Sequence, residues 1–467
     1  MKEQIAGFEV EHVHGPEEIP YKRDELVVLC LVRDGEPWVR SFIEHYFSLG
    51  AKHIVFLDND STDGIVSTAS EYDNVTVLRS KLAFGAGVEG TVGERLMRRY
   101  LIERFGSNRW SLCVDIDELF DYPYSDVIGL DSLLRYLDSK SYTAVTAQML
   151  DMFPEKLSVN SRQEPIKGLR DEYRFYDLSR IDRSRMRKDK DASRNNIIES
   201  DEVAVRVRGG IRDNVFGFKP LLTKYPLLFS DGTLEHISVH AVRNARVADL
   251  TCVLFHYKFY AFALEDYWYR AIEHKRGRGP FMNRRYEQYV EVLEKNTELQ
   301  LKLESSREIA SVNDLLENGF LVASEGYIGW VDAEEEKNIW QADPQSKPYE
   351  LAAAFLESRR LARAKTLTVG RLERQLLEHR RQEQIKDQRI NKLKEQRDSQ
   401  GQKIQELKEQ WLDRDQKIQR LQRKQQRLRK RNDRLKKQRA NVAASRTWRL
   451  VEGLHRIKAK ALDVRKR

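Results

Sequence analysis

The chain has 467 residues, of which 40% are hydrophobic and 33% are charged, and its formal net charge is +9. That length is enough for two or three units with buried cores, so a single small binding module is excluded. The charge is unevenly distributed, because residues 355–467 carry a net +22 and the residues before them a net −13. The sequence therefore predicts an acidic globular body joined to a basic tail.

Hydropathy and cysteine usage point to a cytoplasmic protein. No stretch approaches the roughly 18 apolar residues of a membrane span, and the first 15 residues contain no apolar signal core. Cys30, Cys113 and Cys252 lie in apolar runs without the spacing of a disulfide framework or a zinc site. We expect them to be reduced thiols in the core.

The first 150 residues alternate between strand and helix patterns after a polar leader, residues 1–24. The predicted elements are a strand at Leu26–Val32, a helix that closes at Gly50, strands at His53–Leu57 and Val75–Leu78, a helix at Thr91–Phe105, a strand led by Trp110 that Asp115, Asp117 and Glu118 follow, and a strand at Thr143–Leu150. Continuous apolar runs joined by helices are typical of a parallel sheet covered on both faces. This pattern predicts an α/β body over 25–300, interrupted by a polar insertion at 155–208 and followed by a helical connector at 301–355.

The tail is predicted to be a basic coiled coil over 356–440, followed by a basic amphipathic segment over 441–467. From Val369 one heptad frame holds for ten repeats, and twelve of the twenty a and d residues are apolar. Asn432 at an a position and the absence of proline favour a coiled coil over a lone solvated helix. We expect self-association through this segment, or docking of a partner's coiled coil.

Polar residues follow several predicted strands, where open α/β sheets bind their ligands. Asp115 and Asp117 bracket Ile116, and alternation along an extended strand would place both carboxylates on one side. Such a pair suits Mn²⁺ or Mg²⁺ with a nucleotide diphosphate. The simpler alternative is an acidic helix N-terminus at Asp117 and Glu118.

The segment after the second strand, DNDSTDG, offers Asp58 and Asp60 to a nucleoside, as acceptors for a base imide or a ribose hydroxyl. Its alternative is a turn whose Asp or Ser caps the next helix, and the two functions are compatible. No dinucleotide-binding GxGxxG loop follows the first predicted strand, and a Walker-type P-loop is absent from the sequence.

Five ordered motifs resemble the family 2-like glycosyltransferases of GT-A fold, in the branch related to family 92. They are LVRDGEPWVRSFIEHYFSLGAKHIVFLDNDSTDG at Leu31–Gly64, CVDIDELF at Cys113–Phe120, GGIRDNVFG at Gly209–Gly217, LTKYPLL at Leu222–Leu228 and VLFHYKF at Val253–Phe259. The resemblance covers Leu26 to Tyr289. It implies a Rossmann-like, nucleotide-sugar-binding domain with a mixed central sheet.

The resemblance also implies a hexosyltransferase-type activity in polysaccharide biosynthesis, which moves a sugar from a nucleotide-sugar donor to a glycan, lipid-linked or protein acceptor with Mn²⁺ or Mg²⁺. The implied nucleotide-sugar contacts are Arg33, Asp58, Asp60, Arg212, Lys224 and His240. The implied metal ligands are Asp115, Asp117 and His256, and a hydrogen-bonded core histidine is the alternative for His256. The candidate bases are Asp151 and Asp213, although the Glu-Asp pair common in family 2 is missing.

A second class of function rests on the tail. Twelve basic residues and one acidic residue lie between Lys417 and Arg439, and this run favours an anionic partner. The alternative function is therefore a coiled-coil scaffold, or an anionic-surface protein with a degenerate transferase domain. No aromatic residues interleave with the run, which disfavours nucleic acid and leaves peripheral contact with the inner face of the plasma membrane.

Overall fold

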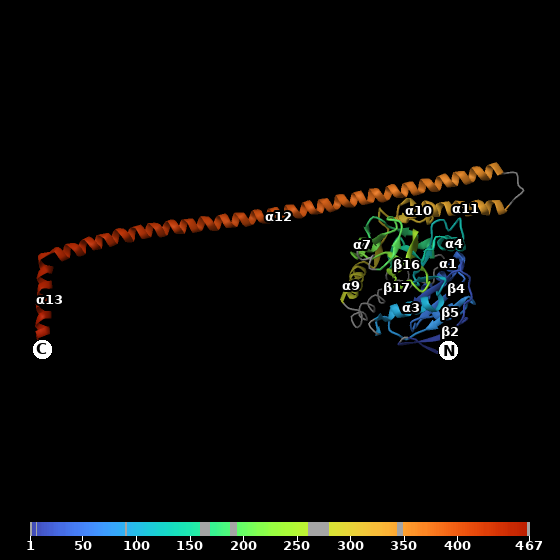
Figure 1. Cartoon of the computed structure of the whole chain (residues 1–467), viewed down its shortest axis with the longest axis horizontal. Helices are drawn as coiled ribbons and strands as arrows, with labels where there is room; N and C mark the ends of the chain where they lie inside the picture. Colours follow the sequence, from blue (N-terminus) through green and yellow to red (C-terminus); the bar gives the residue numbers. More distant parts are fainter. Residues whose placement is uncertain are drawn as a thin grey trace. The chain divides into compact units, whose positions relative to one another are not determined.

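The computed structural model describes residues 2–5, 7–88, 91–158, 169–186, 194–259, 280–342 and 349–464. The chain divides into two compact units, Met1–Glu378 and His379–Arg467. The first unit is a body built on one large β-sheet, and the second consists of helix (Figure 1).

The central sheet is mixed, and its strands run in the order β1-β2-β5-β4-β3-β8-β16-β10-β19-β14. These strands are β1 (Lys2–Ile5), β2 (Phe8–His14), β3 (Val27–Val32), β4 (His53–Asp58), β5 (Val75–Arg79), β8 (Trp110–Val114), β10 (Ala144–Asp151), β14 (Ile197–Ile198), β16 (Thr223–Phe229) and β19 (Arg246–His256). Strands β5, β4, β3 and β8 are parallel, β16 is antiparallel to both β8 and β10, and β10 is parallel to β19. The predicted α/β class and mixed sheet are thus confirmed.

Helices cover both faces of the sheet, as its continuous apolar strands require. The helices of the first half are α1 (Glu36–Leu49), α2 (Ile65–Ala69), α3 (Gly93–Phe105) and α4 (Leu130–Ser139). Alternate residues of β3 enter two separate cores, because Cys30 packs with α1 residues such as Phe42 while Leu29 packs with Met97 and Leu101 of α3. All three cysteines are buried and free, as predicted.

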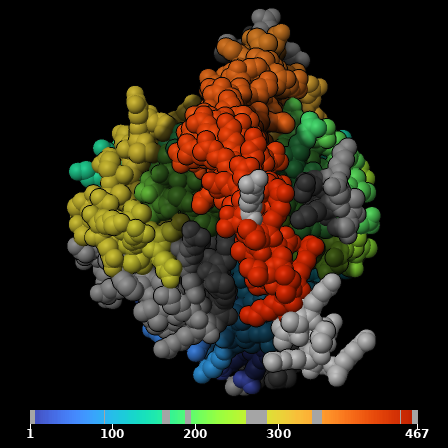
Figure 2. Space-filling view, turned by 90° about the vertical axis from the view of Figure 1, so that its left-hand side faces the viewer, coloured from blue at the N-terminus to red at the C-terminus, as the bar shows by residue number. Residues whose placement is uncertain are grey.

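Short elements occupy much of the two segments that the sequence analysis treated as polar leader and polar insertion. The first segment contributes β1 and β2 to an edge of the sheet, because β2 pairs with β5. The short elements elsewhere in the body are β6 (Gly87–Val88), β7 (Thr91–Val92), β9 (Glu118–Asp121), β11 (Lys156–Ser158), α5 (Leu169–Glu172), β12 (Phe175–Tyr176), β13 (Ile181–Arg185), β15 (Val205–Gly209), α7 (Ile211–Phe216), β17 (Glu235–Ser238), β18 (Ala241–Arg243), β20 (Glu298–Gln300) and β21 (Arg307–Glu308). Figure 2 shows α9 (Pro280–Lys295), in yellow, on the surface of this unit, where it contacts α7.

The body continues beyond the predicted boundary at residue 300. It includes α10 (Asn313–Glu317), α11 (Glu325–Ala342) and the first part of α12 (Tyr349–Ala444), up to Glu378. Gly370 of α12 lies so close to α10 that an added Cβ would stand 2.1 Å from the carbonyl oxygen of Leu316. The start of the long helix is therefore packed on the body, whereas the predicted coiled coil began at residue 356.

A buried histidine, His53, is expected to make the stability of the body depend on pH. His53 begins β4, and one of its ring nitrogens lies 2.9 Å from the hydroxyl of Thr76. Burial lowers the pKa of His53 from 6.5 to about 4. Below pH 6.5 the unfolded chain therefore binds a proton at His53, whereas the folded chain keeps His53 neutral until about pH 4. The free energy of unfolding consequently falls as the pH drops below 6.5.

We expect the replacement His53→Gln to remove about 1 to 2 kcal/mol of the stability loss seen between pH 7 and pH 5. Urea unfolding at the two pH values measures it, with the free energy of unfolding compared between variant and wild type. An identical pH dependence in the two proteins would show that His53 is not held neutral by the fold.

The second unit contains the remainder of α12 and a final helix, α13 (Arg446–Val464). The apolar residues of α13, among them Trp448, Leu454 and Ile457, are exposed. Within the described part of the chain, no helix is both long enough and apolar enough to cross a membrane.

Candidate functional site

Strand directions bring several predicted site residues to one edge of the sheet. Strands β8, β10 and β19 point the same way, and their carboxyl ends are followed or closed by Asp115, Asp151 and His256. Strand β16 runs in the opposite direction, so Lys224 at its start lies at the same edge. Residues far apart in the sequence therefore meet where an open α/β sheet binds its ligands.

Two cations hold Asp115. Lys224 donates to one carboxylate oxygen at 2.8 Å, and Arg98 of α3 pairs with the other. Burial raises the pKa of Asp115, but the nearby Lys224 and Arg98 outweigh burial and hold that pKa well below its usual range. Even so, the Asp115 side chain keeps 33% of its surface exposed, so a ligand can reach the carboxylate.

A buried glutamate completes the group around Lys224. Glu118 is 1% exposed and accepts a hydrogen bond from the Lys224 ammonium. Burial lowers the pKa of Lys224, but the facing carboxylates of Asp115 and Glu118 raise it overall. Lys224 is therefore a fixed positive charge and not a proton acceptor.

A second chain of charges runs through Asp117, His256, Asp151 and Arg212. His256 lies 3.2 Å from Asp117 through Nε2 and 2.5 Å from Asp151 through Nδ1. The other oxygen of Asp151 accepts from Arg212 at 2.7 Å. Burial lowers the pKa of His256, but Asp117 and Asp151 outweigh it and raise that pKa above its ordinary value.

Asp117 is the exposed end of this chain, with 22% of its side chain accessible. Burial raises its pKa, but the imidazolium of His256 lowers it to about 2. Asp151 and Arg212, by contrast, are each only 3% exposed. The buried end thus fixes the histidine ring, and the exposed end is left for a ligand.

The two aspartates of the DxD motif do not reach this edge by alternation along a strand. Strand β8 ends at Val114, and residues 115–117 form a turn in which the Glu118 amide donates to the Asp115 carbonyl at 3.1 Å. Asp115 faces α3 and β16, whereas Asp117 faces β19. The helix N-terminus considered as an alternative is also wrong, because Glu118 begins strand β9.

The loops after β3 and β4 are joined to each other. Asp34 accepts from the Thr62 amide at 2.8 Å, and its own amide donates to the Ser61 hydroxyl at 2.9 Å. Asp58 is only 1% exposed and pairs with Arg79 at 2.9 Å, so its carboxylate holds the loop. Asp60 and Arg33 are exposed beside it, and Asp60 adopts a left-handed φ of 58°.

The GGIRD motif brings Arg212 to the site through two glycines with positive φ, 103° at Gly209 and 80° at Gly210. A Cβ on Gly209 would stand 2.0 Å from the carbonyl oxygen of Arg180, so only glycine fits.

Asp213 follows on α7, half-buried, and no hydrogen bond or ion pair joins its side chain to the residues that the structure describes. His240 forms a hydrogen bond with the Thr223 carbonyl through Nδ1 at 2.8 Å. Burial, and to a lesser extent the positive charge of Lys224, lower the pKa of His240 to about 4.

Two members of the site, Arg98 and Glu118, are not predicted from the sequence as functional residues. Arg98 lies on α3 within the basic run RLMRRY, where nothing in the sequence separates it from its neighbours Arg95 and Arg99. Glu118 enters the sequence-based predictions only as part of an alternative helix N-terminus, but its burial beside Lys224 makes it part of the charge network. A helical arginine that is 3% exposed is recognised only after the sheet has been assembled.

Asp117 and His256 would suit a divalent cation such as Mn²⁺ once His256 releases its Nε2 proton, because the pair then combines a partly exposed carboxylate with a neutral imidazole whose Nδ1 is fixed by Asp151. Asp115 would join them only by exchanging one of its ion pairs. In the described residues, no three His, Cys, Asp or Glu side chains converge closely enough to form a ready-made metal cluster. The three predicted ligands are thus neighbours along one edge, engaged with protein cations or with each other.

Comparison of the sequence with protein-family models and with curated proteins gives no match. The fold and the site by themselves define an α/β protein with a charged cluster at the carboxyl edge of a mixed sheet.

Proposed function

We propose that the body is a metal-dependent glycosyltransferase that uses a nucleotide-sugar donor. The observation that carries the proposal is the convergence of Asp115, Asp117 and Lys224 with the His256–Asp151 pair at one sheet edge, with both DxD carboxylates partly exposed. The mixed central sheet agrees with the fold that the motif resemblance implies.

Asp117 and His256 would hold the cation, which when bound neutralises charge on the departing diphosphate. Lys224 is a buried, permanently charged partner of Asp115 and fixes the direction of that carboxylate. Asp60 and Arg33 are exposed on the adjoining loops and are accessible to the nucleoside and its phosphates. Asp58 supports them through Arg79.

Transfer at an anomeric carbon also requires removal of a proton from the acceptor hydroxyl. Both oxygens of Asp151 are occupied, by His256 and Arg212, and Asp151 is 3% exposed. Burial raises the pKa of Asp151, but Arg212 and His256 lower it overall, which makes this carboxylate a weak base. Of the two candidate bases, Asp213 suits the proton transfer better, and Asp151 positions His256.

Calorimetry of the full chain with UDP, GDP, CDP and TDP, each with Mn²⁺, with Mg²⁺ and with EDTA, tests the proposal. We expect one nucleotide to bind in the presence of metal and to lose its affinity in EDTA. If none of the four binds under any condition, the body is not a transferase of this kind.

The replacement Asp117→Asn is expected to weaken metal-dependent nucleotide binding by about 100-fold or more, because loss of an outer-shell partner alone costs 10- to 100-fold. The fold should persist, since the replacement removes one of several closely spaced acids. Titration of the variant with nucleotide and Mn²⁺ measures the effect, and Asp131→Asn, which removes a surface carboxylate paired with Arg135, is the matched control. Equal affinity in the Asp117 variant and the control would remove Asp117 from the metal site.

A further inference from the structure

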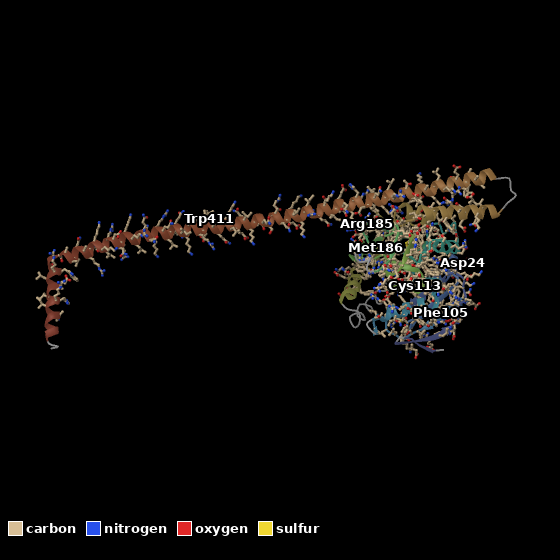
Figure 3. All side chains as sticks on the ribbon, in the orientation of Figure 1. Asp24, Phe105, Cys113, Arg185, Met186 and Trp411 are labelled. Carbon is tan, nitrogen blue, oxygen red and sulfur yellow. The ribbon has the colours of Figure 1, made fainter. Side chains whose placement is uncertain are left out.

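The second unit carries an apolar face along α12 that is exposed among the residues that the structure describes. The apolar a and d residues between Ile390 and Leu435 are 48% to 67% exposed. Figure 3 shows the side chains around Trp411, an a residue, projecting from the bare helix. Residues with this spacing bury their surface when a second helix packs along them.

The residues that flank this face decide which helix can pack there. In the second unit, the charged g residues are all basic: Arg389, Lys403, Lys417, Lys424 and Arg431. In a parallel pair of helices, each g residue faces the e residue of the next heptad on the partner. Two copies of this chain would therefore place Arg389 against Lys394, Lys403 against Lys408, Lys424 against Arg429 and Arg431 against Lys436.

In a parallel pair, no attractive g–e contact compensates for these repulsions. The two acidic e residues, Asp387 and Asp415, would face Gln382 and Gln410 in a parallel pair. In an antiparallel pair g residues face g residues and e residues face e residues, so every contact between two charged g residues would be basic against basic, and five of the seven charged e residues are basic as well. The flanks thus oppose self-association in both orientations.

The seam itself contains further charges of the same sign. Lys386, Arg397 and Arg414 occupy d or a positions, where a parallel second copy would place each cation against its own equivalent. Along the helix, like charges also repeat four residues apart, as in Arg420 with Lys424 and Arg427 with Arg431, which destabilises a solitary helix. An acidic partner would relieve both kinds of repulsion.

We infer that α12 over residues 379–438 is one strand of a heteromeric coiled coil, and that its partner is a helix of another protein with apolar a and d residues and Asp or Glu at e and g. The apolar seam distinguishes this partner from nucleic acid, which needs the cations but not the apolar stripe. The inference replaces the self-association expected from the heptads alone, and it does not depend on the proposed transferase activity.

The test uses the full chain and two labelled synthetic helices spanning eight heptads. The acidic probe has Ile at a, Leu at d and Glu at e and g, with Glu also opposite Lys386, Arg397 and Arg414; the control probe has Lys at e and g. Fluorescence anisotropy at about 0.15 M salt should show the acidic probe binding about 100-fold or more tightly than the control, with affinity falling as salt is added. Light scattering should show the chain alone as a monomer.

A matched pair of double variants distinguishes the effect of charges that flank the a and d seam from the effect of net charge alone. Lys424→Glu with Arg431→Glu changes two g residues, and Lys430→Glu with Lys437→Glu changes the net charge equally at two f residues on the outer face. The g variant should bind the acidic probe about tenfold more weakly and should begin to self-associate, because the new carboxylates face Arg429 and Lys436 of a second copy. The f variant should do neither.

Four outcomes would overturn the inference. These are a stable dimer of the wild-type chain at micromolar concentration, equal binding of the two probes, equal effects of the g and f variants, and binding of a DNA duplex or of phosphatidylserine vesicles by residues 379–438 without binding of the acidic probe. The last result would assign the basic helix to a polyanion or a membrane.

Discussion

Replacement of Arg363 by alanine is expected to lower the free energy of unfolding of the body by about 3 to 5 kcal/mol. Arg363 lies on α12 and is 4% exposed, and its guanidinium pairs with Asp332 at 2.5 Å and with Glu335, both on α11. The alanine variant would leave two largely buried carboxylates without their main cation. An uncompensated buried charge costs more than the ion pair contributes, which is the reason for the large effect.

Arg359 is the matched control, because it contacts the same Glu335 at 3.2 Å but is 40% exposed. Its replacement by alanine should cost no more than about 1 kcal/mol, the usual value of a surface pair. Chemical denaturation of both variants, followed by a signal from the body, measures the difference. Similar small losses in both variants would mean that α12 does not form part of the cooperative body.

The strands of the body were predictable because their sequences leave little alternative. Val27–Val32 and His53–Asp58 are buried at every position, and such runs between helical patterns indicate a parallel sheet covered on both faces. The order of the strands was not predictable, since β16 enters between β8 and β10 from a distant part of the sequence. Sequence patterns report burial and direction, whereas insertion of an antiparallel strand depends on long-range pairing.

The candidate site was predictable as a set of strand ends, but its pairings were not. Asp115, Asp151 and His256 each follow or close a strand, so their common edge follows from parallel directions. The ion pairs of Lys224 with Asp115 and of Asp151 with His256 depend on which strands are neighbours in the sheet. Arg98 had no sequence signal, because its role arises from a helix packing against the sheet.

The boundary between body and tail was misplaced for a related reason. The charged, helical pattern continues without a break across residues 356–378, yet Arg363 is buried and Gly370 packs against α10. The heptad frame begins at Val369 on the exposed side of this packed segment, where Leu372 and Leu376 remain accessible. A single helix can thus use one face for the body and another for a partner, and a sequence pattern reveals only the more regular of the two.

The second large effect is expected for Asp151→Asn, which should cost about 3 kcal/mol or more of stability and reduce turnover together with it. The asparagine would leave Arg212, 3% exposed, and the His256 ring without their shared anion. His256 would then lose one of the two carboxylates that raise its pKa and fix its orientation toward Asp117. Urea unfolding and sugar-transfer assays of the same variant measure the two losses.

Asp213→Asn provides the contrast that assigns the base. The Asp213 side chain makes no ion pair with any described residue, so its replacement should change stability by less than about 0.5 kcal/mol. If Asp213 accepts the acceptor proton, turnover should fall by 100-fold or more, in line with the roughly 10²- to 10⁴-fold contribution of general bases, while nucleotide binding stays intact. The opposite pattern, full turnover in the Asp213 variant and a stable but inactive Asp151 variant, would return the base to Asp151 and require His256 to move away from it during the reaction.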